Sequence, residues 1–113
     1  MKSFKSSPQF ENNFKQLFKK YNTLEGDFEK LKKILIPYPT GVGKNFTIIH
    51  AEQECKIVKA RMACRALRDR SLRVIYAYTE AAEQFYFIEI YFKGKQVNEN
   101  RGLIKEFLKQ FSK

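Results

Sequence analysis

The stretch Lys56–Lys95 constrains this chain most, because it combines strand-like runs with a high density of positive charge. Its first eighteen residues, Lys56–Arg73, carry seven Lys or Arg and one acid, Asp69. Alternate side chains of a strand point to opposite faces, so Lys59 and Arg61 share one face and apolar residues share the other. One face of the sheet can therefore pack on a core while the other presents fixed positive charge. Such a surface suits a polyanion, and RNA is the first candidate.

Length and composition suit one folded domain that spans residues 1–113. The chain is 43% hydrophobic and 15% aromatic, which is enough to build a core. Its net charge of +10 and isoelectric point of about 9.7 are high for so small a domain. This excess favours nucleic acid, an anionic membrane surface or an acidic protein as the partner.

Residues that hold metals or form reactive centres are sparse. Cys55 and Cys64 have no other soft ligands nearby, so we predict no metal site and two reduced thiols. His50 is expected to be a structural residue, exposed or hydrogen-bonded. The run 41–44 lacks the spacing of a phosphate loop, and we predict no cofactor. Neither a signal peptide nor an apolar run of membrane-spanning length is present, so we expect a cytoplasmic protein without a membrane segment.

Apolar periodicity predicts two helices near the N-terminus. Ser7 is a suitable N-cap for the first, whose apolar stripe ends near Tyr21. Asn22 with Glu25 resembles a capping box for the second, which is expected to stop at Pro37. Because so few residues join them, the two helices should form an antiparallel hairpin that packs on a sheet.

Strand-like runs dominate the second half of the chain. Predicted strands at Lys56–Ala63, Leu72–Thr79 and Phe85–Phe92 are joined by short turns, which is typical of an antiparallel meander. Lys2–Lys5 and Phe46–His50 are candidates for further short strands. In the third strand of the meander, one face is predicted to carry Ile88, Ile90 and Phe92, and the other Glu89 and Tyr91.

A closing helix, capped by Asn98 or Asn100, completes the predicted order of elements. We therefore predict an α+β fold in two layers, with an N-terminal helix hairpin and a C-terminal helix packed on a small antiparallel sheet.

The order of these elements resembles the RelE/ParE family of toxins from type II toxin–antitoxin pairs. The matching segments are KIVKARM at 56–62, LRVIYAY at 72–78, FIEIYFK at 87–93 and NEN at 98–100 before the last helix. The resemblance implies a RelE-like fold. It also implies an endoribonuclease that cleaves messenger RNA at the ribosome, without a metal, by attack of a ribose 2′-oxygen on the adjacent phosphate. A small acidic antitoxin would bind the protein and silence it.

The resemblance also implies which residues act. The paired basic residues of the first main strand correspond to Lys59 and Arg61, and the Arg that opens the next strand corresponds to Arg73. The basic residue after the last strand corresponds to Lys95, or to Lys93 if the turn is placed differently. Surrounding cations would lower the pKa of Lys59 and make it a base. The family's C-terminal tyrosine has no clear equivalent, and Arg101 falls near its place.

Further basic and aromatic residues are expected to bind the RNA. By alternation, Tyr76 and Tyr78 lie opposite Arg73 and should be in the core, whereas Tyr91 shares parity with Lys93 and is the better candidate to stack a base. The predicted RNA-binding residues are Arg65, Arg68, Arg70, Tyr91, Lys93 and Arg101.

Three alternatives remain at this point. A ParE-like toxin would share the fold and inhibit a DNA topoisomerase without nuclease chemistry. A non-toxic basic domain would only bind RNA. Finally, the cations could be solvated charges on an exposed sheet face with no ligand, as charge runs often are.

Overall fold

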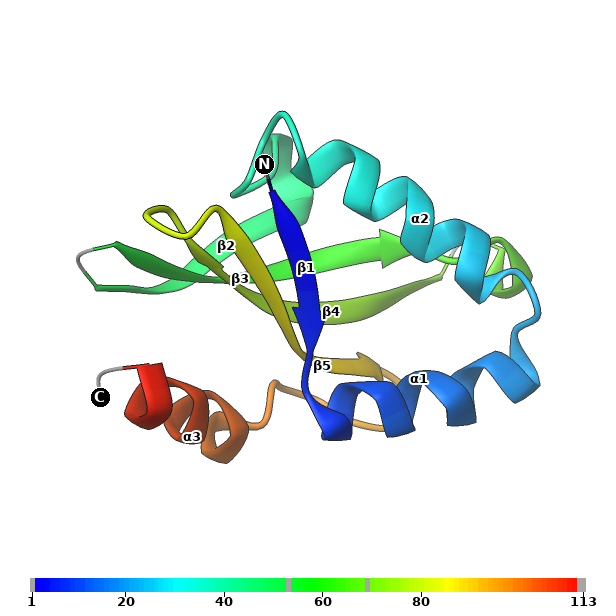
Figure 1. The fold of residues 1–113 in the computed structure, drawn as a ribbon. Helices are drawn as coiled ribbons and strands as arrows, with labels where there is room; N and C mark the ends of the chain where they lie inside the picture. The colour runs from blue at the N-terminus through cyan, green and yellow to red at the C-terminus, as the bar shows by residue number, and fades with distance from the viewer. Residues whose placement is uncertain (1, 53, 69, 112–113) are drawn as a thin grey trace.

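In the computed structural model, which describes residues 2–52, 54–68 and 70–111, three helices pack on a five-stranded sheet (Figure 1). The strands lie in the order β1-β5-β4-β3-β2. They are β1 (Ser3–Ser6), β2 (Phe46–Glu52), β3 (Cys55–Ala63), β4 (Ser71–Thr79) and β5 (Gln84–Phe92). The helices are α1 (Pro8–Lys20), α2 (Leu24–Leu35) and α3 (Arg101–Phe111), and two short 3-10 turns are η1 (Gly43–Asn45) and η2 (Arg65–Leu67).

The sheet is mixed. Strands β3 to β5 form the expected antiparallel meander, and β2 extends it by pairing antiparallel with β3. Strand β1 pairs with β5 in parallel, with Ser3 opposite Gln84. The prediction of a wholly antiparallel sheet is therefore wrong at this edge. Ser7 secures the pairing, because its backbone N–H donates to Phe87 O at 2.9 Å and its hydroxyl donates to Ile88 O at 3.0 Å. The strand is too short to show its direction by periodicity.

The helix hairpin covers one face of the sheet. Figure 1 shows α1 and α2 meeting at the right of the view and diverging across that face as an open V. Alternate residues of β3 and β4 face the helices, as predicted for Tyr76, which is fully buried. The core on this side includes Phe10, Leu24, Leu31, Leu35, Val58, Ala60, Met62, Cys64, Leu72, Val74, Tyr76, Phe85, Phe87 and Ile90, with Tyr78 packed against it.

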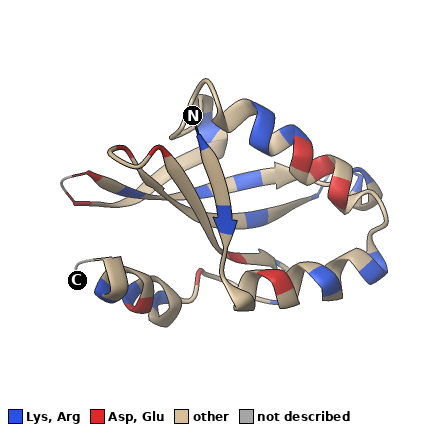
Figure 2. Cartoon of the chain, in the orientation of Figure 1, with Lys and Arg blue, Asp and Glu red and all other residues tan. Residues whose placement is uncertain are grey.

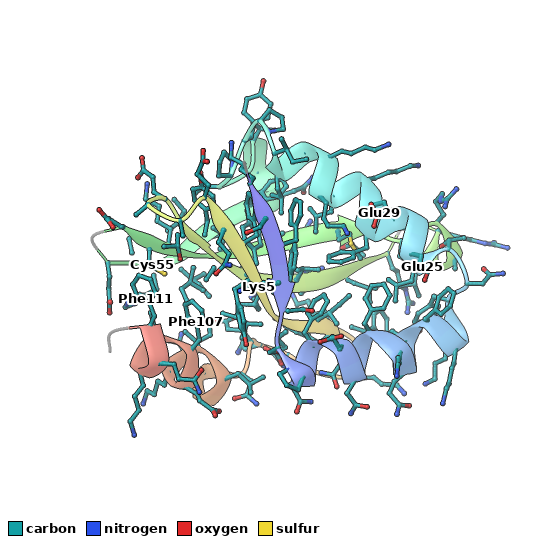
Figure 3. The ribbon with its side chains drawn as sticks, viewed as in Figure 1. Lys5, Glu25, Glu29, Cys55, Phe107 and Phe111 are labelled. Atoms are coloured by element: carbon teal, nitrogen blue, oxygen red, sulfur yellow. The ribbon has the colours of Figure 1, made fainter. Side chains whose placement is uncertain are left out.

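Helix α3 covers part of the opposite face, so the fold has three layers rather than the two predicted. Phe107 and Phe111 extend from α3 toward the sheet near Cys55 (Figure 3). Ile104 and Phe107 pack on a second apolar cluster that includes Cys55, Ile57, Ile75, Ala77, Ile88 and Tyr91. Because Cys55 and Cys64 lie in different clusters, the two buried thiols stay apart, and both are free.

A β-bulge in β5 overturns part of the predicted alternation. Ile75 pairs with Glu89, but the next residue, Tyr76, pairs with Phe87, so Ile88 is the extra residue. An extra residue shifts the side-chain parity of the strand. Ile88 consequently packs in the cluster under α3, while Ile90 packs on the hairpin side.

Capping explains where the helices begin. The Ser7 hydroxyl accepts a hydrogen bond from Phe10 N at 3.0 Å, as expected. The predicted capping box of Asn22 and Glu25 is wrong, since Thr23 is the N-cap of α2. Of the two candidates for the closing helix, Asn100 caps α3, and its side-chain oxygen accepts from Gly102 N at 2.9 Å.

The remaining expectations concern single features. His50 lies 3.0 Å from Glu52 Oε1, as a hydrogen-bonded surface residue. Within residues 2–52, 54–68 and 70–111, no group of three or more His, Cys, Asp or Glu is arranged to hold a metal ion. None of the helices in these ranges has the length and apolar character needed to cross a membrane.

Candidate nucleic-acid interface

Two arginines face each other across neighbouring strands on the α3 side of the sheet. Arg61 of β3 pairs directly with Arg73 of β4, and Arg73 pairs in turn with Tyr91 of β5. Like charges placed opposite each other destabilise a sheet. Burial lowers the pKa of the Arg73 guanidinium, and the charge of Arg61 lowers it further. The pair therefore contributes no favourable charge interaction to the fold.

A shallow depression of about 420 Å³ lies at this end of the sheet. We call its four cations, Arg61, Arg70, Arg73 and Lys93, the basic depression. Arg73 Nη1 donates to Ser71 Oγ at 2.8 Å, which fixes the direction of its side chain. Among the described residues, no ion pair involves any of the four cations. Figure 2 shows Lys and Arg along β3 and β4.

The turn after β5 places Lys93 at the depression. A Cβ at Gly94 would lie 2.5 Å from the Phe92 ring, so only glycine allows the turn to fold back on that ring. Phe92 and Gly94 both line the depression beside Lys93. The contact between Gly94 and the Phe92 ring therefore places an apolar side chain next to Lys93 in the lining of the depression.

The segment before β4 is held by a buried carboxylate. Asp27 of α2, only 4% exposed, accepts hydrogen bonds from Arg65 N at 3.1 Å and Arg65 Nε at 3.0 Å. Burial alone would raise the pKa of Asp27, but hydrogen bonds from Thr23 and Arg65 outweigh it and lower the pKa. Arg65, predicted to bind RNA, is therefore part of the structural anchor of η2. Its ion pair stabilises the start of the loop that carries Arg70.

Lys59 occupies the next row of the same face, where it pairs with Ile75. Its Nζ donates to Glu99 Oε1 at 3.0 Å. This hydrogen bond raises the pKa of Lys59, against the opposing effect of burial. The predicted lowering of this pKa is therefore wrong. The neighbouring cations were visible in the sequence, but the carboxylate that reaches Lys59 comes from forty residues further along the chain.

A second carboxylate, Glu89, fixes the segment that carries Glu99. Glu89 is buried in β5 and accepts hydrogen bonds from Asn100 N at 2.8 Å and Gln96 Nε2 at 2.7 Å. It thereby anchors the connection between β5 and α3. Sequence reasoning assigned no role to Glu89 or Glu99. The signal for Glu89 was a single acid within the most apolar strand, where an unpaired charge would be costly.

Tyr91 is buried rather than available for stacking. Only 5% of it is exposed, and its ring packs in the cluster under α3. Its hydroxyl has no hydrogen-bond partner in the described part of the chain. Burial raises the pKa of this hydroxyl, and the nearby Lys59 ammonium acts against that effect without the geometry of a hydrogen bond. The buried ring of Tyr91 is therefore not available to stack a base, contrary to the prediction.

The remaining predicted residues lie outside the basic depression. Lys95 lies beside Lys20, on the far side of Phe92. Arg68 is exposed at the end of η2. Arg101 is exposed at the start of α3, with Nη2 3.8 Å from Glu99 Oε2. The structure thus brings Arg61, Arg70, Arg73 and Lys93 together, with Lys59 in the adjoining row.

Comparison with models of protein families, with curated proteins and with solved structures found no match to this chain.

Proposed function

We propose that this protein is the toxin of a type II toxin–antitoxin pair of the RelE/ParE kind, and that it cleaves messenger RNA at the ribosome in the cytoplasm. The observation that carries the proposal is the cross-strand pair of Arg61 and Arg73 within a depression that also presents Arg70 and Lys93. Arginine forks bind phosphate oxygens in pairs, and side chains on a sheet are held in place before the ligand arrives. This combination favours RNA phosphate as the ligand of these cations, over the alternative that they are solvated charges with no ligand.

The proposed chemistry is an internal transfer of the phosphoryl group. The ribose 2′-oxygen forms a bond to phosphorus while the bond from phosphorus to the 5′-oxygen breaks, which leaves a cyclic phosphate and a 5′-hydroxyl. Arg61 and Arg73 stabilise the negative charge that develops on the phosphate oxygens. Lys59, which carries its proton beside Glu99, is the proposed donor of a proton to the departing 5′-oxygen. The Glu99 carboxylate beside it is the proposed acceptor of the 2′-hydroxyl proton.

The decisive experiment measures cut ends on ribosome-bound messenger RNA together with translation arrest in cells. Arg73→Ala should lower cleavage by about 10²–10³, as expected for loss of one preorganised donor to a developing charge. Lys59→Ala should be comparably damaging. Lys59→Arg should not restore activity, because an arginine neither releases nor accepts a proton at neutral pH. Lys19→Ala, at an exposed cation of α1 that does not line the basic depression, is the control and should be nearly silent.

A small acidic antitoxin is the proposed partner. A protein with a net charge of +10 would otherwise bind RNA without selectivity. An acidic protein that covers the basic depression would neutralise the positive charge there. Harmless high-level expression of the isolated chain, with no partner recovered from a strain that carries the neighbouring genes, would contradict this proposal.

The second candidate is a ParE-like toxin that inhibits a topoisomerase by binding alone. This candidate is favoured by the ion pair between Lys59 and Glu99, because Lys59 held in this pair cannot act as the predicted base. Full toxicity of Arg73→Ala, or arrest of DNA replication with intact messenger RNA, would support this candidate. RNA binding with no toxicity would instead support a non-toxic RNA-binding domain.

A further inference from the structure

A second pair of cations lies across Phe92 from the basic depression. Lys20 belongs to the last turn of α1, and Lys95 belongs to the turn that follows β5. Their ammonium groups lie side by side, and both side chains are exposed. Two like charges brought together by separate segments repel each other, and this cost is relieved when an anion lies between them.

The two lysines line a depression of about 360 Å³ between α1 and the end of β5. Asn13 and Gln16 line it as well, and their spacing of three and four residues places them on the same face of α1 as Lys20. The Asn13 side-chain oxygen already accepts a hydrogen bond from Gln9 Nε2 at 3.0 Å. This bond uses the oxygen of the Asn13 amide, so the amide nitrogen is the group that could donate to a phosphate. None of the described residues that line the depression is acidic.

We propose that Lys20 and Lys95 form a second phosphate subsite, which holds one phosphate of the RNA strand whose neighbouring nucleotides occupy the basic depression. The subsite rests on the proposed function, since it takes the same ligand. Phe92 lines both depressions, so a strand that leaves one passes over this ring into the other. Lys95 then binds substrate instead of acting in the chemistry that the family resemblance implies for it.

Electrostatics agree with this geometry. Contact with Lys20 lowers the pKa of Lys95, and the repulsion between their charges lowers it further. A phosphate bound between the two ammonium groups would favour the charged form of Lys95 and reverse this shift.

The test measures binding of a single-stranded RNA of about ten nucleotides, with 2′-O-methyl riboses that prevent cleavage, over a range of salt concentrations. The double variant Lys20→Gln/Lys95→Gln should bind more weakly than wild type. Its plot of log affinity against log salt should become shallower by about 0.7, the expected change for one lost phosphate contact on a single strand. The charge-matched control is Lys15→Gln/Lys19→Gln, which removes two exposed cations of α1 that do not line the depression. The control should keep the wild-type slope.

The outcomes separate this subsite from the proposed nuclease. If the Lys20→Gln/Lys95→Gln variant matches the control, the subsite is refuted, and the loss of cleavage in Arg73→Ala still supports the nuclease. If the lysine variant loses affinity but wild-type protein cuts no messenger RNA, the subsite stands and the nuclease does not. Failure of wild-type protein to bind the RNA refutes both. Circular dichroism of each variant confirms that the fold is retained.

Discussion

The two ends of the α3-facing side of the sheet differ sharply, although the same strands build both. At one end, Ile57 and Ile75 are buried beneath α3. At the other end, two or four residues along the same strands, Arg61 and Arg73 line an open depression. All four side chains share one parity. The comparison shows that alternation places a residue on a face, whereas the extent of the covering helix decides whether that position is buried or open to solvent.

The largest expected effect lies at the covered end. Ile75→Ala should lower the free energy of unfolding by about 2–5 kcal/mol, because it leaves a cavity beneath α3 where the side chain is now fully buried. Urea denaturation measures this loss. The control is Ile48→Ala on β2, where the side chain is 48% exposed and the expected change is under about 0.5 kcal/mol. An equal loss of unfolding free energy in Ile75→Ala and Ile48→Ala would contradict the view that the cover of α3 makes Ile75 part of the core.

The boundary between the two ends should show a smaller, pH-dependent effect. Burial acts to raise the pKa of Glu99, but its hydrogen bond from Lys59 and the charge of that lysine lower it overall. A lowered carboxyl pKa stabilises the fold above the unfolded pKa, and this contribution is lost as pH falls through the folded pKa. The raised pKa of Lys59 stabilises the fold below its unfolded pKa, and this contribution is lost as pH rises through the folded value.

Glu99→Gln should therefore cost up to about 1 kcal/mol of stability near neutral pH. The difference from wild type should begin to shrink as pH falls below the unfolded carboxyl pKa of about 4.3, and should disappear only below the lower pKa of the folded protein. Thermal unfolding measured from acidic to neutral pH checks this prediction. A difference that stays constant across the range would show that the ion pair does not act through the charge of Glu99.

The smallest effect on stability is expected at the open end. Arg73→Gln should change the free energy of unfolding by less than about 0.5 kcal/mol, because the lost contacts are offset by relief of the repulsion from Arg61. The same substitution should severely impair cleavage. Paired denaturation and cleavage assays would establish the contrast, and a loss of stability comparable to that of Ile75→Ala would place Arg73 in the structural framework instead.

Local signals predicted much of the fold. Ser7 caps α1 as expected, and the three strands of the meander begin and end within one residue of the predicted positions. These features depend on residues close together in sequence. The parallel pairing of β1 could not be predicted, because it depends on contacts with Phe87 and Ile88 at the other end of the chain.

For the candidate site too, features set by one strand were predictable, and contacts between distant segments were not. Strand parity placed Arg61 and Arg73 on one face, and the register makes them direct partners. Parity could not reveal that Glu99 would reach Lys59, since that contact depends on the path of the chain into α3. Lys95 follows Lys93 by two residues, yet the turn at Gly94 separates the two lysines, because turn geometry does not preserve the alternation of a strand.

The pairing of β1 with β5 also bears on how the chain is assembled during synthesis. Ser7 and Ile88 are 81 positions apart, so the first strand cannot join the sheet until the last strand has left the ribosome. Strands β1 and β5 must therefore meet across a long stretch of chain, which slows folding relative to a chain with local contacts. Lys93 completes the basic depression only at that same late stage. The four cations of the basic depression therefore come together only after β5 has been made.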